Sequence, residues 1–414
     1  MADASAHPGA GVSTALKARL SVMMFLQFFI WGSWFVTLGT FLGGVFNATG
    51  SQTALAFSSQ SYGAIVAPFV VGLIADRYFN AERILGVLHL IGGGLLFAMY
   101  RSDSFAEFAP FVIGYMIVYM PTLALVNSIS FRQLSNPVQQ FGAIRVWGTI
   151  GWIAAGLIIS FLGWDSDRGS ALQITFLLAA VASAILGIYS FTLPPTPPET
   201  DVGENLRDRV GLTALWLLKD RNFAVFFIAS ILICIPLGFY YQNANPFLVE
   251  IGTSNPTAKM TIGQISEVGF LLVLPYFLGR FGVKKTLLVG MAAWSLRYVM
   301  FAIGYQSDVA ALLILGIALH GLCYDFFFVC GQVYTDERAG KACKSSAQGL
   351  ITLATYGVGM LAGFWAAGLV TDLFAAEAGH DWLSIWLVPA GLAALVFTLF
   401  LVSFRSRVDR FGNE

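Results

Sequence analysis

Residues 171–193 read ALQITFLLAAVASAILGIYSFTL, an apolar run without a charged side chain, and residues 194–198 read PPTPP. About 20 apolar residues in a helix are enough to cross the ~30 Å hydrocarbon core of a bilayer. The prolines open the longest polar interval of the chain, residues 194–221, which we interpret as a semi-rigid and then solvated linker. A membrane-spanning helix therefore ends near the middle of the chain and a linker follows it.

Composition extends this interpretation to the whole chain. Hydrophobic residues make up 57% of the 414 residues and charged residues only 11%, and the mean hydropathy is +0.74. A soluble domain carries about 25% charged residues. Hydropathy predicts twelve spans of about 20 residues each. They lie at residues 20–44, 60–79, 84–101, 108–130, 143–163, 171–193, 222–248, 262–280, 285–304, 309–331, 346–372 and 383–404.

Six spans precede the linker and six follow it, so we predict an all-α polytopic membrane protein built from two halves, residues 18–193 and 222–404. Basic residues concentrate in alternate loops, and by the positive-inside rule both tails (residues 1–17 and 405–414) and the linker (194–221) are cytoplasmic. Two six-helix halves with an internal repeat are the layout of a transporter that binds substrate between them. Basic short loops also resemble one another by chance, so the repeat alone is weak.

The loop after the second span is a candidate conformational latch. It reads GLIADR from Gly72 to Asp76 and Arg77, with a weak counterpart at residues 279–288. Glycine permits close helix approach, and Asp76 can cap a helix end and pair with an arginine on the cytoplasmic side. The alternative is that Asp76 and Arg77 only establish topology. The loop resembles the loop signature of the major facilitator superfamily.

Four ionisable residues lie deep inside predicted spans: Arg145, Glu267, Arg297 and Asp325. A charge persists inside a bilayer where it faces a protein interior or a watery cavity and has a partner, so each is a candidate functional residue. The alternative for each is a structural ion pair. We favour that alternative for Arg297, with Asp325 as the candidate partner, because the ninth span usually lies outside the central cavity of that superfamily.

Seven runs, spread from the first span to the eleventh, carry a more specific resemblance. They are LQFFIWGSW (26–34), YMPTLALVN (119–127), IRVWGTIG (144–151), QISE (264–267), WSLR (294–297), DFF (325–327) and SAQG (346–349). Together they resemble the bacterial nucleoside:proton symporter family, which includes nucleoside and xanthosine permeases. The resemblance implies the twelve-helix major facilitator fold and nucleoside import coupled to protons.

Helical spacing gives several of these residues a shared face. Arg145, Thr149 and Trp152 are spaced i, i+4, i+7 and offer a fork of donors, a hydroxyl and an aromatic plane. Gln264 and Glu267 are spaced i, i+3 and present an amide beside a carboxylate. A nucleoside needs stacking for its base and directional polar partners for its ribose, and this inventory fits both.

Further candidates for the substrate site lie in the tenth and seventh spans. His320 and Tyr324 share one face of the tenth span, with a structural histidine as the alternative for His320. The seventh span adds polar side chains, of which we select Tyr241, Gln242 and Asn245. The aromatic residues Trp31 and Trp34, with Gln27, either line the cavity or, for the tryptophans, anchor the membrane interface.

The resemblance also implies roles. In the family, the residues matching Arg145, Thr149, Gln264 and Glu267 contribute to the substrate pocket, and the residue matching Asp325 takes part in binding and proton coupling. We therefore expect proton coupling at Asp325 or Glu267. An Asp325 that carries a proton would have to alternate between that proton and an arginine partner.

Three departures from the family leave the substrate open. The polar residues of the seventh span are arranged differently: Tyr240, Tyr241, Gln242, Asn243 and Asn245. His320 stands where the family has an aromatic residue, and Trp152 replaces a phenylalanine. These changes could alter base preference or admit another sugar-like solute, so a permease for a sugar, nucleobase or glycoside is the first alternative. A membrane sensor that binds without translocating is the second.

The sequence thus predicts a proton-coupled nucleoside importer that works by alternating access, not an enzyme. We expect a monomer in the lipid bilayer of a bacterial inner membrane, with the proton as coupling ion, no other cofactor and no nucleic-acid partner. The chain has no Walker motif and no Cys/His metal cluster, which disfavours an ATP-driven pump. We interpret its four cysteines as small hydrophobes: Cys234, Cys323, Cys330 and Cys343.

Overall fold

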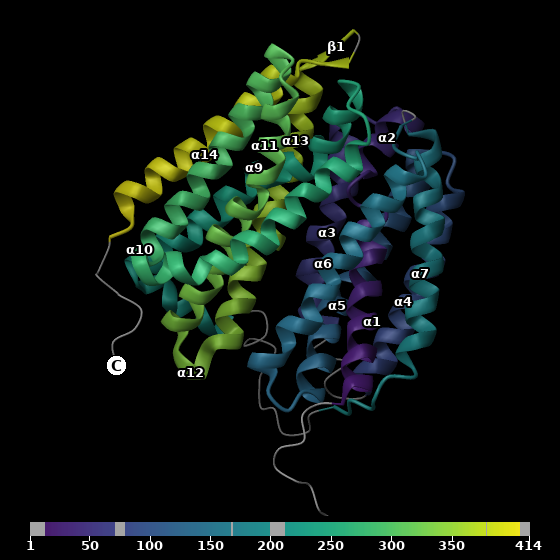
Figure 1. The fold of residues 1–414 in the computed structure, drawn as a ribbon, viewed down its shortest axis with the longest axis vertical. Helices are drawn as coiled ribbons and strands as arrows, with labels where there is room; N and C mark the ends of the chain where they lie inside the picture. Colours follow the sequence, from purple (N-terminus) through teal and green to yellow (C-terminus); the bar gives the residue numbers. More distant parts are fainter. Residues whose placement is uncertain (1–12, 71–78, 167–168, 199–211, 378, 406–414) are drawn as a thin grey trace, which may run out of the picture.

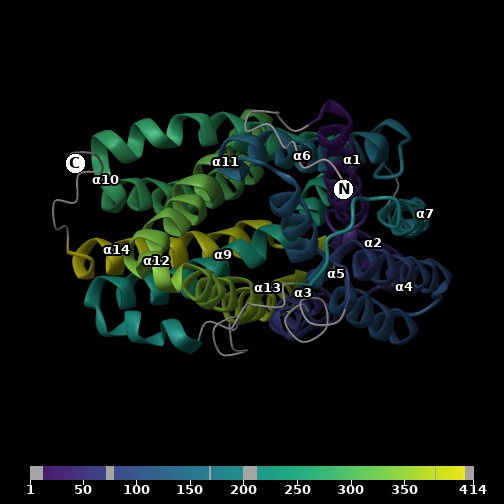
Figure 2. The same ribbon diagram turned by 90° about the horizontal axis from the view of Figure 1, so that it is seen from below.

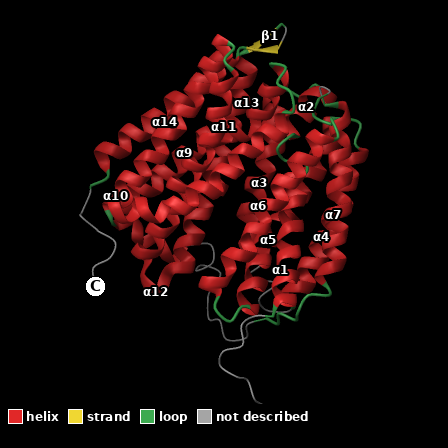
Figure 3. Ribbon diagram, viewed as in Figure 1, coloured by secondary structure: helices red, strands yellow, loops and turns green. Residues whose placement is uncertain are grey.

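The chain folds almost entirely into helices (Figure 3). The computed structural model describes residues 13–70, 79–166, 169–198, 212–377 and 379–405. Within these residues, ten helices are long and apolar enough to cross a membrane. The prediction of a helical, polytopic membrane protein is therefore confirmed.

The helices lie in two groups, seen on the right and the left of Figure 1. The first helix group contains α1 (Thr14–Gly32), α2 (Leu38–Phe46), α3 (Gly50–Val70), α4 (Ala81–Arg101), α5 (Phe105–Gln133), α6 (Pro137–Phe161), η2 (Ser170–Gln173) and α7 (Ile174–Ser190). The second helix group contains η3 (Leu212–Lys219), α9 (Arg221–Glu250), α10 (Pro256–Ser307), α11 (Ala310–Tyr324), η4 (Asp325–Val329), α12 (Cys330–Thr352), η5 (Leu353–Gly359), α13 (Met360–Leu373) and α14 (Trp382–Ser403).

The first predicted span, residues 20–44, is broken into α1 and α2. Hydroxyl groups compete with the helix for its carbonyls at the break: Ser33 donates to the Phe29 carbonyl over 2.7 Å, and Thr37 donates to the Trp34 carbonyl over 3.3 Å. Such bonds back to the preceding turn often bend helices. The break lies beside the cavity described below.

Two glycines divide the longest helices of the second group. Gly282 in α10 has φ 71° and ψ 172°, and Gly340 in α12 has φ 64° and ψ 176°. Residues with a side chain rarely adopt such positive φ values, so glycine is needed at both turns. Gly282 falls between the predicted spans 262–280 and 285–304, and Gly340 falls between the predicted spans 309–331 and 346–372.

A short β-hairpin between α13 and α14 was not predicted. β1 (Ala375–Ala376) pairs antiparallel with β2 (Gly379–His380). The backbone N–H of His380 donates to Glu250 over 2.7 Å, and Nδ1 of His380 lies 2.8 Å from the other oxygen of that carboxylate. The hairpin is thereby tied to the end of α9. We call this end of the molecule, with the starts of α3 and α10, the hairpin end (top of Figure 1).

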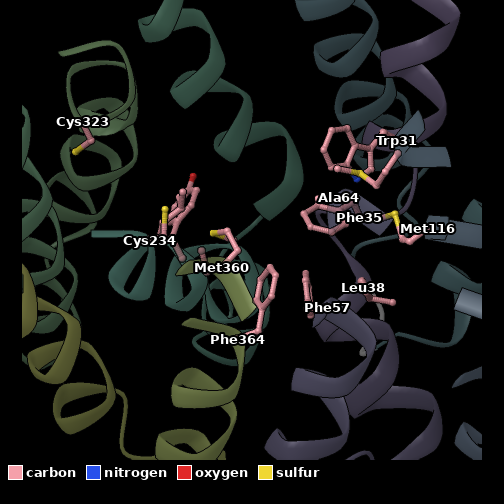
Figure 4. Close-up of a cluster of buried hydrophobic side chains, with 14 of the residues drawn as sticks. Trp31, Phe35, Leu38, Phe57, Ala64, Met116, Cys234, Cys323, Met360 and Phe364 are labelled. Carbon is pink, nitrogen blue, oxygen red and sulfur yellow. The ribbon is translucent and has the colours of Figure 1, made fainter. Parts of the chain in front are cut away.

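The two helix groups pack against each other along α3 and α13, which lie side by side in Figures 1 and 2. Phe57 of α3 and Phe364 of α13 point toward each other (Figure 4), with ring centroids 5.3 Å apart. Toward the hairpin end, the Thr40 hydroxyl donates to Asn245 of α9 over 2.6 Å. Apolar packing and hydrogen bonds therefore both join the groups.

Some predicted features lie outside the described residues. These include the latch residues Gly72, Asp76 and Arg77, together with residues 199–211 of the linker and 406–414 of the C-terminal tail. At the other end of the chain, α1 already begins at Thr14, where Ser13 accepts from the Leu16 N–H over 3.2 Å. The helix thus starts inside the segment that was predicted as a tail.

Candidate functional site

The second helix group contains two π-helical turns, η4 and η5. Tyr324, directly before η4, and Tyr356, within η5, join their hydroxyl groups over 2.7 Å. Asp325 begins η4 and is only 1% exposed, and among the described residues its Oδ2 atom has no hydrogen-bond partner. π-helical turns occur frequently at functional sites, because the extra residue changes the direction of the side chains.

Glu267 on α10 lies at the centre of this region. Its charge interacts with Asp325 and, across the two helix groups, with Arg145 of α6. It also interacts with Tyr324 and Tyr356. The structure therefore brings together three of the four ionisable residues that the sequence singled out.

Glycine places Glu267 close to α11. A side chain at Gly321 would collide with the backbone of Glu267, and the Gly321 N–H donates to the Ser266 hydroxyl over 3.1 Å. The two helices consequently approach backbone to backbone at the carboxylate. This contact orients Glu267 relative to Tyr324, one turn further along α11.

The face of α6 that the spacing predicted forms the opposite wall. Arg145 lies over the ring of Phe28 of α1, 4.2 Å from the centroid. Trp152 meets Trp31 edge to face, with centroids 5.5 Å apart. Arg145, Thr149 and Trp152 are all half-buried, so each retains some accessible surface.

A cavity lies between the two walls toward the hairpin end. It is lined by Val36, Trp152, Gly156, Tyr240, Tyr241, Thr257, Met260, Thr261 and Gln264. Three of these were predicted to bind substrate: Trp152, Tyr241 and Gln264. The cavity combines aromatic planes with an amide and hydroxyl groups, contributed by both helix groups.

Arg297 of α10 is completely buried, and its surroundings differ from the expected ones. Its guanidinium lies 3.8 Å from the ring centroid of Tyr240 and also faces the rings of Trp294, Tyr298 and Phe301. Nη1 lies 3.1 Å from Nδ1 of His320. Within the described residues Arg297 makes no ion pair with Asp325, so the suggested pairing is replaced by aromatic faces and a histidine.

The contact with Arg297 determines the form of His320. A guanidinium nitrogen can only donate, so Nδ1 of His320 accepts and the ring proton lies on Nε2. His320 is therefore neutral in this arrangement. It is buried and stacks on Tyr240, with centroids 5.1 Å apart and the planes inclined by 24°.

Two other predicted binding residues are engaged by the protein itself. Asn245 accepts from Thr40 and donates to Thr257 over 3.2 Å. Gln242 is buried between α9, α3 and α13, where its amide can reach the backbone of Phe364 and Gly368. Both lie where the helix groups meet at the hairpin end, and their contact with substrate stays a prediction.

Sequence reasoning missed Tyr240 and Tyr356 as members of the site. Tyr240 lines the cavity and supports Arg297, and Tyr356 bonds to Tyr324. Buried tyrosines usually need a partner for the hydroxyl, so a tyrosine inside an apolar span is a usable signal. It could have singled out both residues.

Comparison with known proteins connects this geometry to a family. Residues 14–409 match the family described as Nucleoside H+ symporter. The chain belongs to the nucleoside:proton symporter family. YegT of Escherichia coli K12 is 41% identical over 94% of this chain and 93% of its own. The xanthosine permease of the same strain is 35% identical, over 95% of this chain and 97% of its own.

Solved structures agree with this membership. The crystal structure of the nucleoside transporter NupG superposes with a TM-score of 0.86 at 31% identity, covering 95% of this chain and 100% of that one. A peptide transporter superposes with a TM-score of 0.72 at only 13% identity, over 93% of both chains. The second likeness concerns the fold alone. The first places this symporter-family chain among multi-pass membrane transporters.

Proposed function

We propose that the chain imports nucleosides together with protons. The observation that carries the proposal is that the opposite charges of Arg145 and Glu267 interact across the two helix groups, next to a cavity lined by Trp152 and Gln264. A carboxylate and an amide can accept from paired ribose hydroxyls or base N–H groups, a guanidinium donates, and an indole stacks. Membership of the nucleoside:proton symporter family supports the same substrate class.

The finer architecture belongs to this proposal. The chain crosses the inner membrane of a bacterium twelve times as a monomer, with both termini cytoplasmic and six crossings in each helix group, and the turns at Gly282 and Gly340 each separate two crossings. The joined hairpin end then faces outward. Rocking of the two groups exposes the site alternately to the two sides.

Proton and nucleoside must favour each other's binding, because coupling between two sites is reciprocal. Asp325 and Glu267 are the carboxylates for this coupling, since both lie in the apolar region and interact with each other. A proton on one of them relieves the repulsion between two neighbouring negative charges. The other can then hold substrate or pair with Arg145.

Uptake of labelled uridine and adenosine by reconstituted vesicles, with and without an inward proton gradient, tests the proposal. Glu267→Gln should lower gradient-driven uptake by about tenfold or more, equivalent to about 1.4 kcal/mol of lost interaction. Asp325→Asn should spare nucleoside binding and abolish accumulation. The matched control is Glu250→Gln, a carboxylate bound to His380 at the hairpin end, which should keep most of the uptake.

Normal gradient-driven uptake in Glu267→Gln would remove that residue from the site, and normal accumulation in Asp325→Asn would remove Asp325 as the obligatory proton carrier. Competition by unlabelled sugars and nucleobases separates a nucleoside site from one for another polar solute. Binding without any accumulation by the unaltered protein would instead indicate a sensor.

A further inference from the structure

Two carboxylates at the hairpin end each cap a helix of the opposite group. Asp372, near the end of α13, accepts from the N–H groups of Gly50 over 2.5 Å and Ser51 over 2.9 Å, which begin α3. It also accepts from the Ser51 hydroxyl over 2.5 Å. The second helix group thus supplies a negative charge to the N-terminus of a helix in the first.

The reverse contact starts in the turn after α6. Asp165 is 1% exposed and accepts from the N–H of Thr257 at the start of α10 over 3.0 Å. It also accepts a short bond from the Ser160 hydroxyl, whose oxygen accepts from the N–H of Ala258 over 2.9 Å. The first helix group therefore caps a helix of the second.

These contacts supply what each helix lacks by itself. At α3, Thr49 and Gln52 form a local capping box that satisfies the Gln52 N–H over 3.2 Å, and the N–H groups of the two preceding residues, Gly50 and Ser51, donate to Asp372. At α10, Asn255 makes no side-chain cap, and Pro256 has no N–H. The first free donors of both helices are thus satisfied by the opposite group, and the positive end of each helix dipole meets a carboxylate.

The two contacts are equivalent by position in the proposed twelve-crossing arrangement. α3 and the first part of α10 are the second crossings of their groups, whereas α6 and α13 belong to the fifth crossings. Asp165 follows the fifth crossing of the first group and caps the second crossing of the second group. Asp372 lies near the end of the fifth crossing of the second group and caps the second crossing of the first group. Thr40 and Asn245 join the first crossing to the seventh between them.

We propose that Asp165 and Asp372 form a reciprocal pair of clasps that hold the hairpin end closed and set how often it opens. Both bridge groups that must separate there in alternating access, so the proposal rests on the proposed function. When the groups separate, both carboxylates and the first N–H groups of two helices lose their partners together. Water replaces the partners of the exposed Asp372 more readily than those of the buried Asp165, so Asp165 contributes more.

Distance measurement between two spin labels tests the clasps without requiring transport. Labels on Gly43→Cys in α2 and Ala376→Cys in β1 report the separation of the groups at the hairpin end. Both positions are exposed, and a side chain at Gly43 meets nothing within 4 Å. The half-buried Cys343 is replaced by serine in every variant, because it is the most accessible native thiol of the described residues.

Asp165→Ala should raise the long-distance population about threefold or more, Asp372→Ala should raise it less, and the double variant should exceed both. The matched control is Asp381→Ala. Asp381 also caps a helix at this end, through the Ser384 N–H at 3.2 Å, but that helix belongs to its own group. The control should keep the distribution of the unaltered protein.

Unchanged distances in both clasp variants, or an equal shift in the Asp381 control, would overturn the proposal. If Asp165→Ala does not fold, Asp165→Asn keeps the size and one acceptor without the charge, and it should shift the distances in the same direction by a smaller amount. An unchanged distribution in that variant also overturns the clasps. If the unaltered protein does not take up nucleosides but the clasp variants still shift the distances, the proposed substrate is refuted and the clasps are supported.

Discussion

Each helix group contains a buried polar cluster, and the two clusters are built on opposite principles. In the first group, His89 of α4 joins Gln27 over 2.8 Å and Ser183 over 3.1 Å, and Gln27 donates to Thr122 over 2.7 Å. All four side chains are neutral amides, hydroxyls or an imidazole with a partner. In the second group, Arg297 carries a full charge that faces aromatic rings, a histidine nitrogen and the Cys323 thiol.

The difference indicates that the first cluster is structural, whereas the second can change its hydrogen-bond partners. Removing a partner from a paired network leaves a buried group unsatisfied, which costs about 1–3 kcal/mol. A buried guanidinium without a carboxylate keeps donors in reserve: Nε and Nη2 of Arg297 have no hydrogen-bond partner in the described part of the chain. Asp325 is likewise incompletely paired. Both of these incompletely hydrogen-bonded side chains lie in the helix group that contributes Glu267.

Of the changes that compare the two polar clusters, the largest effect is expected from removing the buried charge of Arg297. Arg297→Met should lower nucleoside uptake by about tenfold or more. The free energy of unfolding should change by less than about 1 kcal/mol, because the loss of the donor to Nδ1 of His320 is offset by removal of the desolvation cost of a buried charge. Uptake and thermal unfolding in detergent are measured together. Arg280→Met, at a cation exposed near the turn of α10, serves as the control. A strong loss of stability would mean that Arg297 is structural.

A change in the polar cluster of the first helix group should instead lower stability and leave substrate binding nearly unchanged. Gln27→Leu leaves the Nε2 proton of His89 without a partner and removes the donor to the Thr122 hydroxyl, which keeps only its bond to the Tyr119 carbonyl. It should therefore lower the free energy of unfolding by about 2 kcal/mol. The affinity for uridine should change by no more than about twofold. Thermal unfolding and equilibrium binding are the measurements. A large loss of affinity with unchanged stability would move Gln27 from the structural cluster to the substrate site.

The smallest effect is expected at His320. His320→Tyr keeps an aromatic ring that can stack on Tyr240, but it changes the group that Arg297 faces. Uptake of uridine relative to adenosine should shift by about threefold, or about 0.7 kcal/mol, which is comparable to the net contribution of one hydrogen bond. Competition uptake measures the ratio. An unchanged uptake ratio would mean that His320 supports Arg297 and does not influence the choice of nucleoside.

The helices and their polar faces were largely predictable from the sequence. The spacing of Arg145, Thr149 and Trp152 predicted one wall of the site, because helical periodicity alone determines which residues share a face. The approach of Glu267 to Asp325 was not visible, since the two lie in different spans. Long-range proximity is set by packing, which no local pattern encodes.

The break between α1 and α2 and the two π-helical turns were also missed. Ser33 and Thr37 are tolerated inside helices, so only their observed bonds to carbonyls reveal the break. The partner of Arg297 was misjudged for a related reason. Charge balance suggested Asp325, whereas a guanidinium can also be stabilised by the faces of aromatic rings, which sequence position does not reveal.

The contact between Gly50 and Gly368 gives the hairpin end a mechanical stop. A side chain at either glycine would collide with the backbone of the other helix, so α3 and α13 meet with nothing deformable between them. Flexible side chains would let the groups settle at many separations, whereas two backbones in contact permit one. Under the proposed alternating access, we therefore expect the same closed position whether the site is empty or loaded, so that substrate changes how often the hairpin end closes but not how far.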